Sequence, residues 1–161
     1  MTHRMLRMPL AGIEGHRLLA LVDEYIGLLE GPRSGADDAM DRLAPNPYPD
    51  DAEAAAEYRR STREDLFDRR VEDARVVRTG LGEFETTGIE AVARECTVLI
   101  RPAEVDHWLR TLSGIRLVLA RRLGIDGSDE HDAGDPRYGV YDWLGYRLEL
   151  LVLLADRHDA R

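Results

Sequence analysis

The segment from residue 138 to residue 154 constrains the fold more than any other part of the chain. It reads Tyr-Gly-Val-Tyr-Asp-Trp-Leu-Gly-Tyr-Arg-Leu-Glu-Leu-Leu-Val-Leu-Leu. At helical spacing it carries two neighbouring apolar stripes: Tyr141, Leu144, Leu148 and Leu151 in one, and Trp143, Leu150 and Leu154 in the other. A surface helix of a small domain needs one stripe of roughly 100°. The wider apolar surface predicts a central core helix, a partner-binding helix, or both.

The length and composition are typical of one soluble globular domain. A chain of 161 residues, 43% hydrophobic and 33% charged, is long enough to build a core of its own. We therefore expect a single helical domain over residues 1–161. No apolar run approaches the roughly 20 residues that cross a bilayer, and the N-terminal residues do not form a secretory signal. We expect no membrane contact and a cytoplasmic location.

The charge argues against a protein that binds nucleic acid by itself. The net charge is −9, whereas affinity for a duplex depends largely on neutralising phosphates. A local basic face would still be compatible with this total. Five arginines are candidates for a patch across two antiparallel helices: Arg110, Arg116, Arg121, Arg122 and Arg147. A solvated helix face is the simpler interpretation, so DNA remains a weakly supported partner.

The periodicity predicts a mostly α, single-domain helical bundle with a minor two-stranded β ribbon. We expect helices over about residues 12–30, 38–43, 51–60, 61–78, 102–123 and from 136 onward, and strands over 3–8 and 94–100. Asp50 or Asp51 can cap the third helix. The spacing of Ser61 and Glu64 matches a capping box, which would start a separate fourth helix. The charged residues of that helix, Asp73 among them, are expected on solvated faces.

The loop over residues 126–135 carries five acids and invites a metal interpretation. An EF-hand-type loop needs glycine at its sixth position and a carboxylate at its twelfth. Counted from Asp126, these positions hold His131 and Arg137, so the pattern fails. No two histidines have the spacing that offers both imidazoles to one ion, and no phosphate loop or nucleophile elbow is present. We expect no metal, no cofactor and no catalytic residues, with 126–135 as a flexible acidic loop.

Cys96 is the single cysteine of the chain, so no intramolecular disulfide can form. It alternates with Val98 and Ile100 on the second expected strand, which favours a buried, small hydrophobic residue. A redox role is the alternative. It would require a nearby cation, and Arg94 is the obvious local one.

The two tryptophan-bearing helices hold the candidate interaction residues. Trp, Tyr and Arg dominate partner interfaces, yet aromatic residues in a bundle more often supply buried area. The residues that we consider as core anchors or contact residues are Trp108, Leu112, Arg116, Tyr141, Asp142, Trp143 and Arg147. The excess apolar width of the last helix also suggests a homodimer face.

Four segments together resemble an actinobacterial family, the AosR-like proteins, long described as a domain of unknown function. They are Arg-Leu-Ala-Pro-Asn-Pro-Tyr-Pro-Asp-Asp at 42–51, Glu-Tyr-Arg-Arg-Ser-Thr-Arg-Glu-Asp-Leu at 57–66, Trp-Leu-Arg-Thr-Leu-Ser-Gly-Ile-Arg-Leu at 108–117 and Tyr-Asp-Trp-Leu-Gly-Tyr at 141–146. The similarity runs in order over most of residues 10–155.

This resemblance implies a non-enzymatic regulator of oxidative-stress transcription whose partner is a sigma factor or another component of the polymerase machinery. Redox-sensing members use a thiol pair, which needs two cysteines within bridging distance. With Cys96 alone, this chain either does not sense oxidants by itself or pairs Cys96 between subunits.

Two other functions compete with the regulator. A small metal-dependent hydrolase would use the acids of 126–135 together with His131. A proteolysis adaptor is suggested by the genes that tend to neighbour members of the AosR-like family. The residues by themselves do not separate these functions from that of a regulator.

Overall fold

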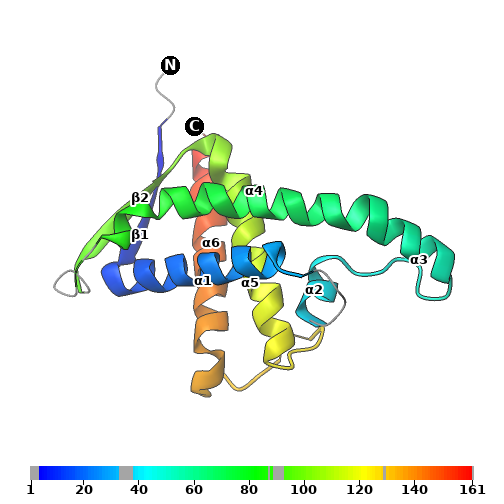
Figure 1. Cartoon of the computed structure of the whole chain (residues 1–161). Helices are drawn as coiled ribbons and strands as arrows, with labels where there is room; N and C mark the ends of the chain where they lie inside the picture. The colour runs from blue at the N-terminus through cyan, green and yellow to red at the C-terminus, as the bar shows by residue number, and fades with distance from the viewer. Residues whose placement is uncertain (1–3, 33–37, 87, 89–92, 129, 161) are drawn as a thin grey trace.

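The computed structural model describes residues 4–32, 38–86, 88, 93–128 and 130–160. It is mostly helical, as predicted, with one small sheet (Figure 1). The strands and α-helices are β1 (Leu6–Ala11), α1 (Gly12–Glu30), α2 (Asp38–Leu43), α3 (Ala52–Tyr58), α4 (Glu64–Gly80), β2 (Glu95–Ile100), α5 (Val105–Arg122) and α6 (Gly139–Asp159). A π-helical turn, η1, spans Arg59–Arg63, and the 3-10 turns are η2 (Gly82–Glu85), η4 (Pro102–Glu104) and η5 (Pro136–Tyr138). None of the described helices is long and apolar enough to cross a membrane.

β1 and β2 form the predicted two-stranded ribbon, which is antiparallel, with Leu6 opposite Ile100 and Ala11 opposite Glu95. The bounds predicted for the first strand, 3–8, are wrong. β1 begins at Leu6 and runs through Pro9 to Ala11. Both strands of a two-stranded sheet are edges, where a proline without an N–H is tolerated. His3, the start of the predicted strand, lies outside the described residues.

The helices pack as two crossing pairs around one core. Figure 1 shows α1 and α4 side by side, running across α5 and α6. Trp108 of α5 packs against Gly80 of α4 and is 1% exposed. A Cβ built on Gly80 of α4 would lie 2.8 Å from Cζ2 of this indole, so the glycine is what allows α4 to approach. The same core includes Phe67, Phe84 and Leu112.

The separate helix predicted to start at Ser61 is not formed. Asp51 does cap α3, accepting hydrogen bonds from the N–H groups of Glu53 and Ala54. The chain then continues through the π-helical turn directly into α4. The Ser61 hydroxyl donates back to the Glu57 carbonyl at 2.8 Å. A serine inside a helix bonds in this way, whereas a capping serine accepts from N–H groups ahead of it. The capping-box prediction is therefore wrong.

Gly124 ends α5 as predicted. It adopts a φ of 71°, the left-handed region that favours glycine. The Gly124 N–H donates to the Arg121 carbonyl and the Ile125 N–H to the Ala120 carbonyl, which is a Schellman motif. Ile125 is thereby buried beside Ala120 and Tyr141. This motif turns the chain toward α6.

α6 is partly a core helix and partly a surface helix. Tyr141, Leu144 and Leu151 of the first predicted stripe are buried. Leu148 and the second stripe, Trp143, Leu150 and Leu154, are half-buried and pack against the core. Beyond both stripes, Tyr146, Val152 and Leu153 are 69%, 44% and 54% exposed. The excess apolar width thus continues onto the surface of the protein.

Candidate functional site

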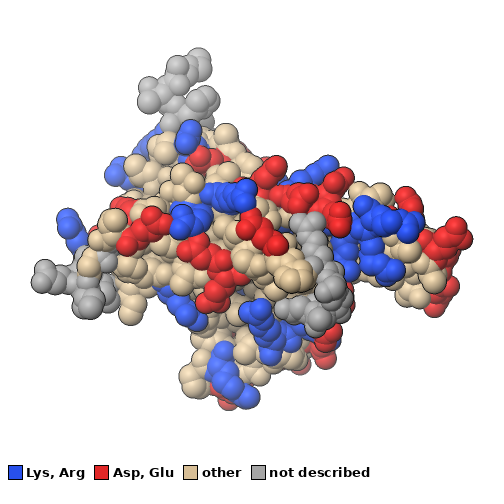
Figure 2. Space-filling model, in the orientation of Figure 1, with Lys and Arg blue, Asp and Glu red and all other residues tan. Residues whose placement is uncertain are grey.

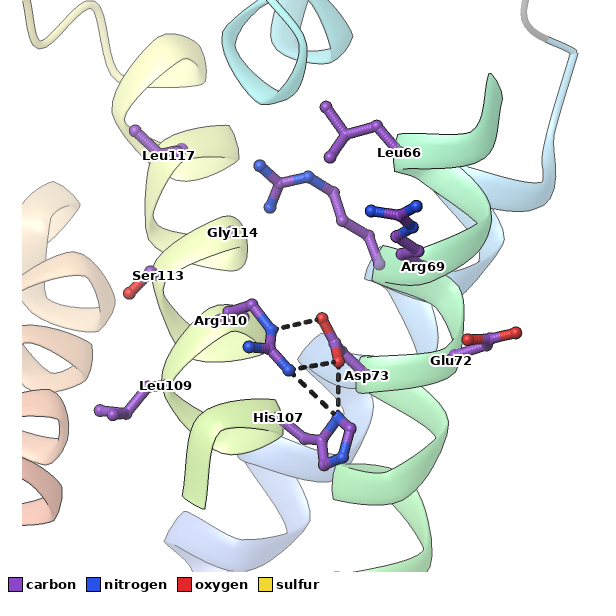
Figure 3. Close-up of a pocket in the computed structure, with 11 residues that line it drawn as sticks. Leu66, Arg69, Glu72, Asp73, His107, Leu109, Arg110, Ser113, Gly114 and Leu117 are labelled. Atoms are coloured by element: carbon purple, nitrogen blue, oxygen red, sulfur yellow. Dashed lines mark hydrogen bonds and ion pairs between the residues drawn. The ribbon is translucent and has the colours of Figure 1, made fainter. Parts of the chain in front are cut away.

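An open groove lies between α4 and α5 and encloses about 720 Å³. This volume is within the range of about 300–1,000 Å³ found for ligand pockets. Leucines and charged residues of both helices line it, and Asp73, His107 and Arg110 meet between the two helices (Figure 3). The apolar residues are Leu66, Leu109 and Leu117, and the charged or titratable ones are Arg69, Arg70, Glu72, Asp73, His107 and Arg110.

Asp73 lies at one end of the groove and is bound by two residues of α5. Arg110 donates from Nε to Oδ2 at 2.8 Å and from a terminal nitrogen to Oδ1 at 3.1 Å. His107 Nδ1 lies 2.6 Å from Oδ1. An ionised carboxylate only accepts hydrogen bonds, so Nδ1 carries the proton. These three residues, which we call the Asp73 cluster, join α4 to α5.

The Asp73 cluster keeps its carboxylate ionised although it is buried. Burial by itself would raise the pKa of Asp73, because a charged carboxylate loses its hydration. The hydrogen bonds from Arg110 and His107 outweigh that effect and hold the pKa below its ordinary value. The same pairing raises the pKa of Arg110.

The cluster contains an Asp–His pair, the arrangement that orients a catalytic base in hydrolases. Such a base needs a nucleophile within hydrogen-bond reach. Ser113 lines the same groove, but its side chain points away from His107 (Figure 3). Arg110 also holds both carboxylate oxygens of Asp73. This geometry fits a structural link between two helices better than a catalytic one.

Arg70 lines the groove, and its Nε atom is buried without a hydrogen-bond partner among the described residues. The Tyr25 hydroxyl is also buried and lies near Arg70 and Gly114. The Arg70 terminal nitrogen donates to the Leu43 carbonyl of α2 at 3.0 Å. Burial raises the pKa of Tyr25, and the nearby Arg70 charge partly opposes this. A Cβ on Gly114 would lie 2.1 Å from the Tyr25 hydroxyl, so the absence of a side chain at Gly114 leaves room for this hydroxyl.

A second polar cluster joins α6 to the start of α1. Glu14 Oε2 accepts from Trp143 Nε1 at 2.5 Å and from Arg147 at 2.7 Å. Arg147 also donates to the Pro9 carbonyl at 2.8 Å. Burial acts to raise the pKa of Glu14, but these donors and the Ala11 N–H lower it overall. Two of the predicted contact residues, Trp143 and Arg147, are therefore used inside the fold.

The other candidate residues of α5 and α6 lie in or against the core. Trp108 and Leu112 are fully buried. The Arg116 guanidinium stacks 3.9 Å above the Tyr141 ring and donates to the Tyr141 carbonyl. Asp142 contacts His131 at 2.7 Å. These residues act as anchors within the domain.

Three of the five arginines considered as candidates for a basic patch are held by separate acidic partners. Arg110 pairs with Asp73, Arg147 with Glu14 and Arg121 with Asp38. Basic and acidic side chains are likewise interspersed over the face of α1 and α4 (Figure 2). One example on that face is Arg78, which contacts both Asp23 and Glu85. No broad basic surface develops from these residues.

The acidic loop is folded against the start of α6 where it is described. His131 stacks near Tyr138 and Tyr141 and contacts Asp142. Asp135 accepts from the Arg137 N–H, as expected of a residue that opens the last helix. Within the described ranges, no three His, Cys, Asp or Glu side chains are grouped so that they could hold a metal ion.

Cys96 is half-buried, so the expectation of a buried residue is correct only in part. Its Sγ lies 3.7 Å from the Arg94 carbonyl. The inner face of β2 is buried at Val98 and Ile100, and Cys96 lies where this face meets the surface.

Sequence reasoning placed Asp73 on a solvated face and attached no role to Glu14. A signal for Asp73 was present. Leu66, Arg70, Asp73 and Val77 recur at intervals of four, three and four residues, which marks one side of a helix. That side faces α5. No comparable signal exists for Glu14, whose partners are 129 and 133 positions away.

One protein family matches the chain over residues 2–155, and its description is "Domain of unknown function (DUF2017)". No curated protein and no solved structure matches the chain.

Proposed function

The chain belongs to the DUF2017 family, a domain of unknown function, and from that premise we propose that it is a regulatory interaction protein that works by binding another protein. One observation carries this proposal. Tyr146 and Leu153 lie exposed on α6, on either side of the half-buried Leu150 and on the same helix face. Neighbouring exposed apolar side chains of this kind suit a protein-binding surface. We call Tyr146, Leu150 and Leu153 the α6 outer face.

The site geometry also supports binding in preference to catalysis. Both carboxylate oxygens of Asp73 are engaged by Arg110 and His107, and Ser113, the serine that lines the groove, points away from His107. His131, which the hydrolase alternative requires, packs against Tyr138 and pairs with Asp142. The observations therefore favour the regulator over the hydrolase.

The transcriptional part of the proposal rests on the resemblance to AosR-like proteins. It makes the partner a sigma factor or another polymerase component, and the process oxidative-stress transcription. The last resembling segment, 141–146, begins at the buried Tyr141 and ends at Tyr146 of the α6 outer face.

The test measures binding of the purified chain to actinobacterial RNA polymerase core enzyme and to its purified sigma factors by biolayer interferometry. We expect one component to bind. Replacing both Tyr146 and Leu153 by Asp should weaken that binding at least about tenfold, because interface centres are dominated by a few apolar anchors. Tyr48→Asp is the matched control, since Tyr48 is 48% exposed but lies between α2 and α3.

Each failure has a separate meaning. If no polymerase component binds, the transcriptional proposal is wrong. If binding is equal in the α6 variant and in Tyr48→Asp, another surface makes the contact. Circular dichroism of each variant verifies that the fold is retained.

A further inference from the structure

A small pocket lies where β1 begins and α6 ends. It encloses about 190 Å³. Both ends of the chain lie at this end of the molecule (Figure 1). The pocket is lined by four basic residues, Arg4, Arg7, Arg157 and His158, together with Met5, Leu6 and Leu154. We call it the terminal pocket.

The basic residues of the terminal pocket lack acidic partners in the described chain, as the set of ion pairs and hydrogen bonds shows. Elsewhere, arginines such as Arg78 and Arg110 each contact a carboxylate. Arg59 and Arg69 also lack such a partner, but they line different pockets. In a protein of net charge −9, the terminal pocket brings together three arginines and a histidine that have no acidic partner among the residues that the structure describes.

The dipole of α6 explains the position of two of the four basic residues. Arg157 and His158 lie in the last turn of α6, where cations are favoured by the carbonyl ends of the helix. That effect does not account for Arg4 and Arg7, which come from another element. Like charges gathered in one place repel each other. A bound anion would remove this repulsion.

We propose that the terminal pocket binds the phosphoryl group of a phosphorylated protein segment. A phosphoryl group carries about −1.5 to −2 charges and three acceptor oxygens, which suits several guanidinium groups. Arginine matches phosphate through paired donors. A single carboxylate would leave most of the positive charge unneutralised. The volume is below the roughly 300 Å³ of pockets for whole small molecules, so the pocket accepts one group of a larger ligand.

The surroundings favour a protein as the carrier of that group. Leu99 lies opposite Arg7 in the ribbon and is 50% exposed. Leu153, next to Leu154 on α6, is exposed as well. Apolar side chains beside a basic pocket suit a peptide, in which an apolar residue can flank the phosphorylated one. A nucleic-acid backbone would instead call for a long series of phosphate contacts.

This inference extends the proposed function, because it names the chemistry of a protein partner. Its first test needs no partner. Inorganic phosphate is titrated into the full chain, and the ring signals of the histidines are followed by NMR. We expect a saturable shift at His158, absent when sodium chloride is added to the same ionic strength. The ring of His16 is the internal control, since it lies beside Phe84.

Variants connect the shift to the pocket. Arg4→Ala combined with Arg157→Ala should weaken phosphate binding at least about tenfold, because two charge-assisted contacts are lost. Arg59→Ala, which removes an arginine without an acid partner from a different pocket, should leave binding unchanged. The absence of a saturable shift at His158, or an equal effect of all variants, overturns the proposal. Either result leaves the polymerase-binding experiment unaffected.

A second titration identifies the carrier. Three peptides with leucines on both sides of the central residue are compared by fluorescence anisotropy, with phosphoserine, serine or aspartate at the centre. The phosphoserine peptide should bind more tightly than the other two. Equal binding of the aspartate peptide contradicts recognition of a phosphoryl group. Tighter binding of a DNA duplex at the same salt concentration contradicts a protein carrier.

Discussion

Asp73 is the side chain that most directly joins α4 to α5. It is buried, while its partner Arg110 is about half exposed. A buried carboxylate with good hydrogen bonds stabilises the fold chiefly because removing its charge leaves the donors unsatisfied. The exposure of Arg110 moderates this effect, since water can solvate the released guanidinium.

Asp73→Asn should lower the free energy of unfolding by about 1–2 kcal/mol. The amide loses the charge that attracts Arg110 and can accept through only one oxygen. Urea denaturation followed by circular dichroism measures the change. Asp65→Asn, at an exposed position of the same helix, should have almost no effect. Equal losses in the two variants would mean that the Asp73 cluster contributes nothing specific.

The same carboxylate predicts the direction of a pH dependence. The folded-state pKa of Asp73 lies below its ordinary value of 3.8. Its contribution to stability is therefore present above that value and is lost as the pH falls through the lower folded pKa. The wild-type chain and Asp73→Asn should differ in unfolding free energy at neutral pH and converge in this acidic range. Urea titrations at a series of pH values test this, and a constant difference would contradict it.

Two helical glycines provide a matched pair of substitutions. Gly114 faces the Tyr25 hydroxyl, whereas a Cβ on Gly27 of α1 meets nothing within 4 Å. Gly114→Ala should destabilise the fold by about 1–3 kcal/mol through overpacking. Gly27→Ala should instead stabilise it by up to about 1 kcal/mol, because alanine favours the helix. Thermal unfolding compares both variants, and a stabilising Gly114→Ala would show that Tyr25 can move aside.

The π-helical turn makes α3, η1 and α4 one continuous helical element. If Ser61 were a cap, Ser61→Ala would cost about 1 kcal/mol. Because its hydroxyl returns to the Glu57 carbonyl, we expect a change within about 0.5 kcal/mol. Asp51→Ala, which removes the true cap, should cost about 0.5–2 kcal/mol. Urea denaturation of both variants distinguishes the two roles, and a larger loss for Ser61→Ala would restore the capping box.

Most elements could be predicted because each has a local signal. Gly124 ends α5, Asp51 caps α3, and the β-branched run before Pro102 forms β2. The predicted start of a new helix at Ser61 is wrong because a capping box is recognised by residue spacing alone, and the same residues can lie inside a helix. The Asp73 cluster could not be predicted in full, since it depends on which face of α4 meets α5. The contacts of Glu14 could not be predicted from the sequence, because they join residues that are far apart along the chain.

The chain exposes 10148 Å². A compact monomer of 18.2 kDa exposes roughly 8,100 Å² by the usual scaling with mass. The difference agrees with the open α4–α5 groove and with α3, which projects from the body of the protein (Figure 1). Such a shape offers much surface to partners.

A second copy of the chain is the alternative occupant of the α6 outer face. Light scattering after size exclusion, at high micromolar concentration, measures the mass. If the face binds a different protein, as we propose, the mass should stay at 18.2 kDa for both the wild-type chain and the Tyr146→Asp and Leu153→Asp double variant. If the wild-type protein instead has the mass of two chains and the double variant has the mass of one, the α6 outer face forms a homodimer.

The uninterrupted path from α3 into α4 also has a mechanical consequence. Residues 52–80, in which α3 bends away from the axis of α4 (Figure 1), form a continuous helical path about 40 Å long at the helical rise. Its far end projects into solvent, and its near half is fastened to α5 by Asp73. A force applied near Ala52 would act through a lever arm, and the torque would reach the groove wall at Leu66 and Arg69.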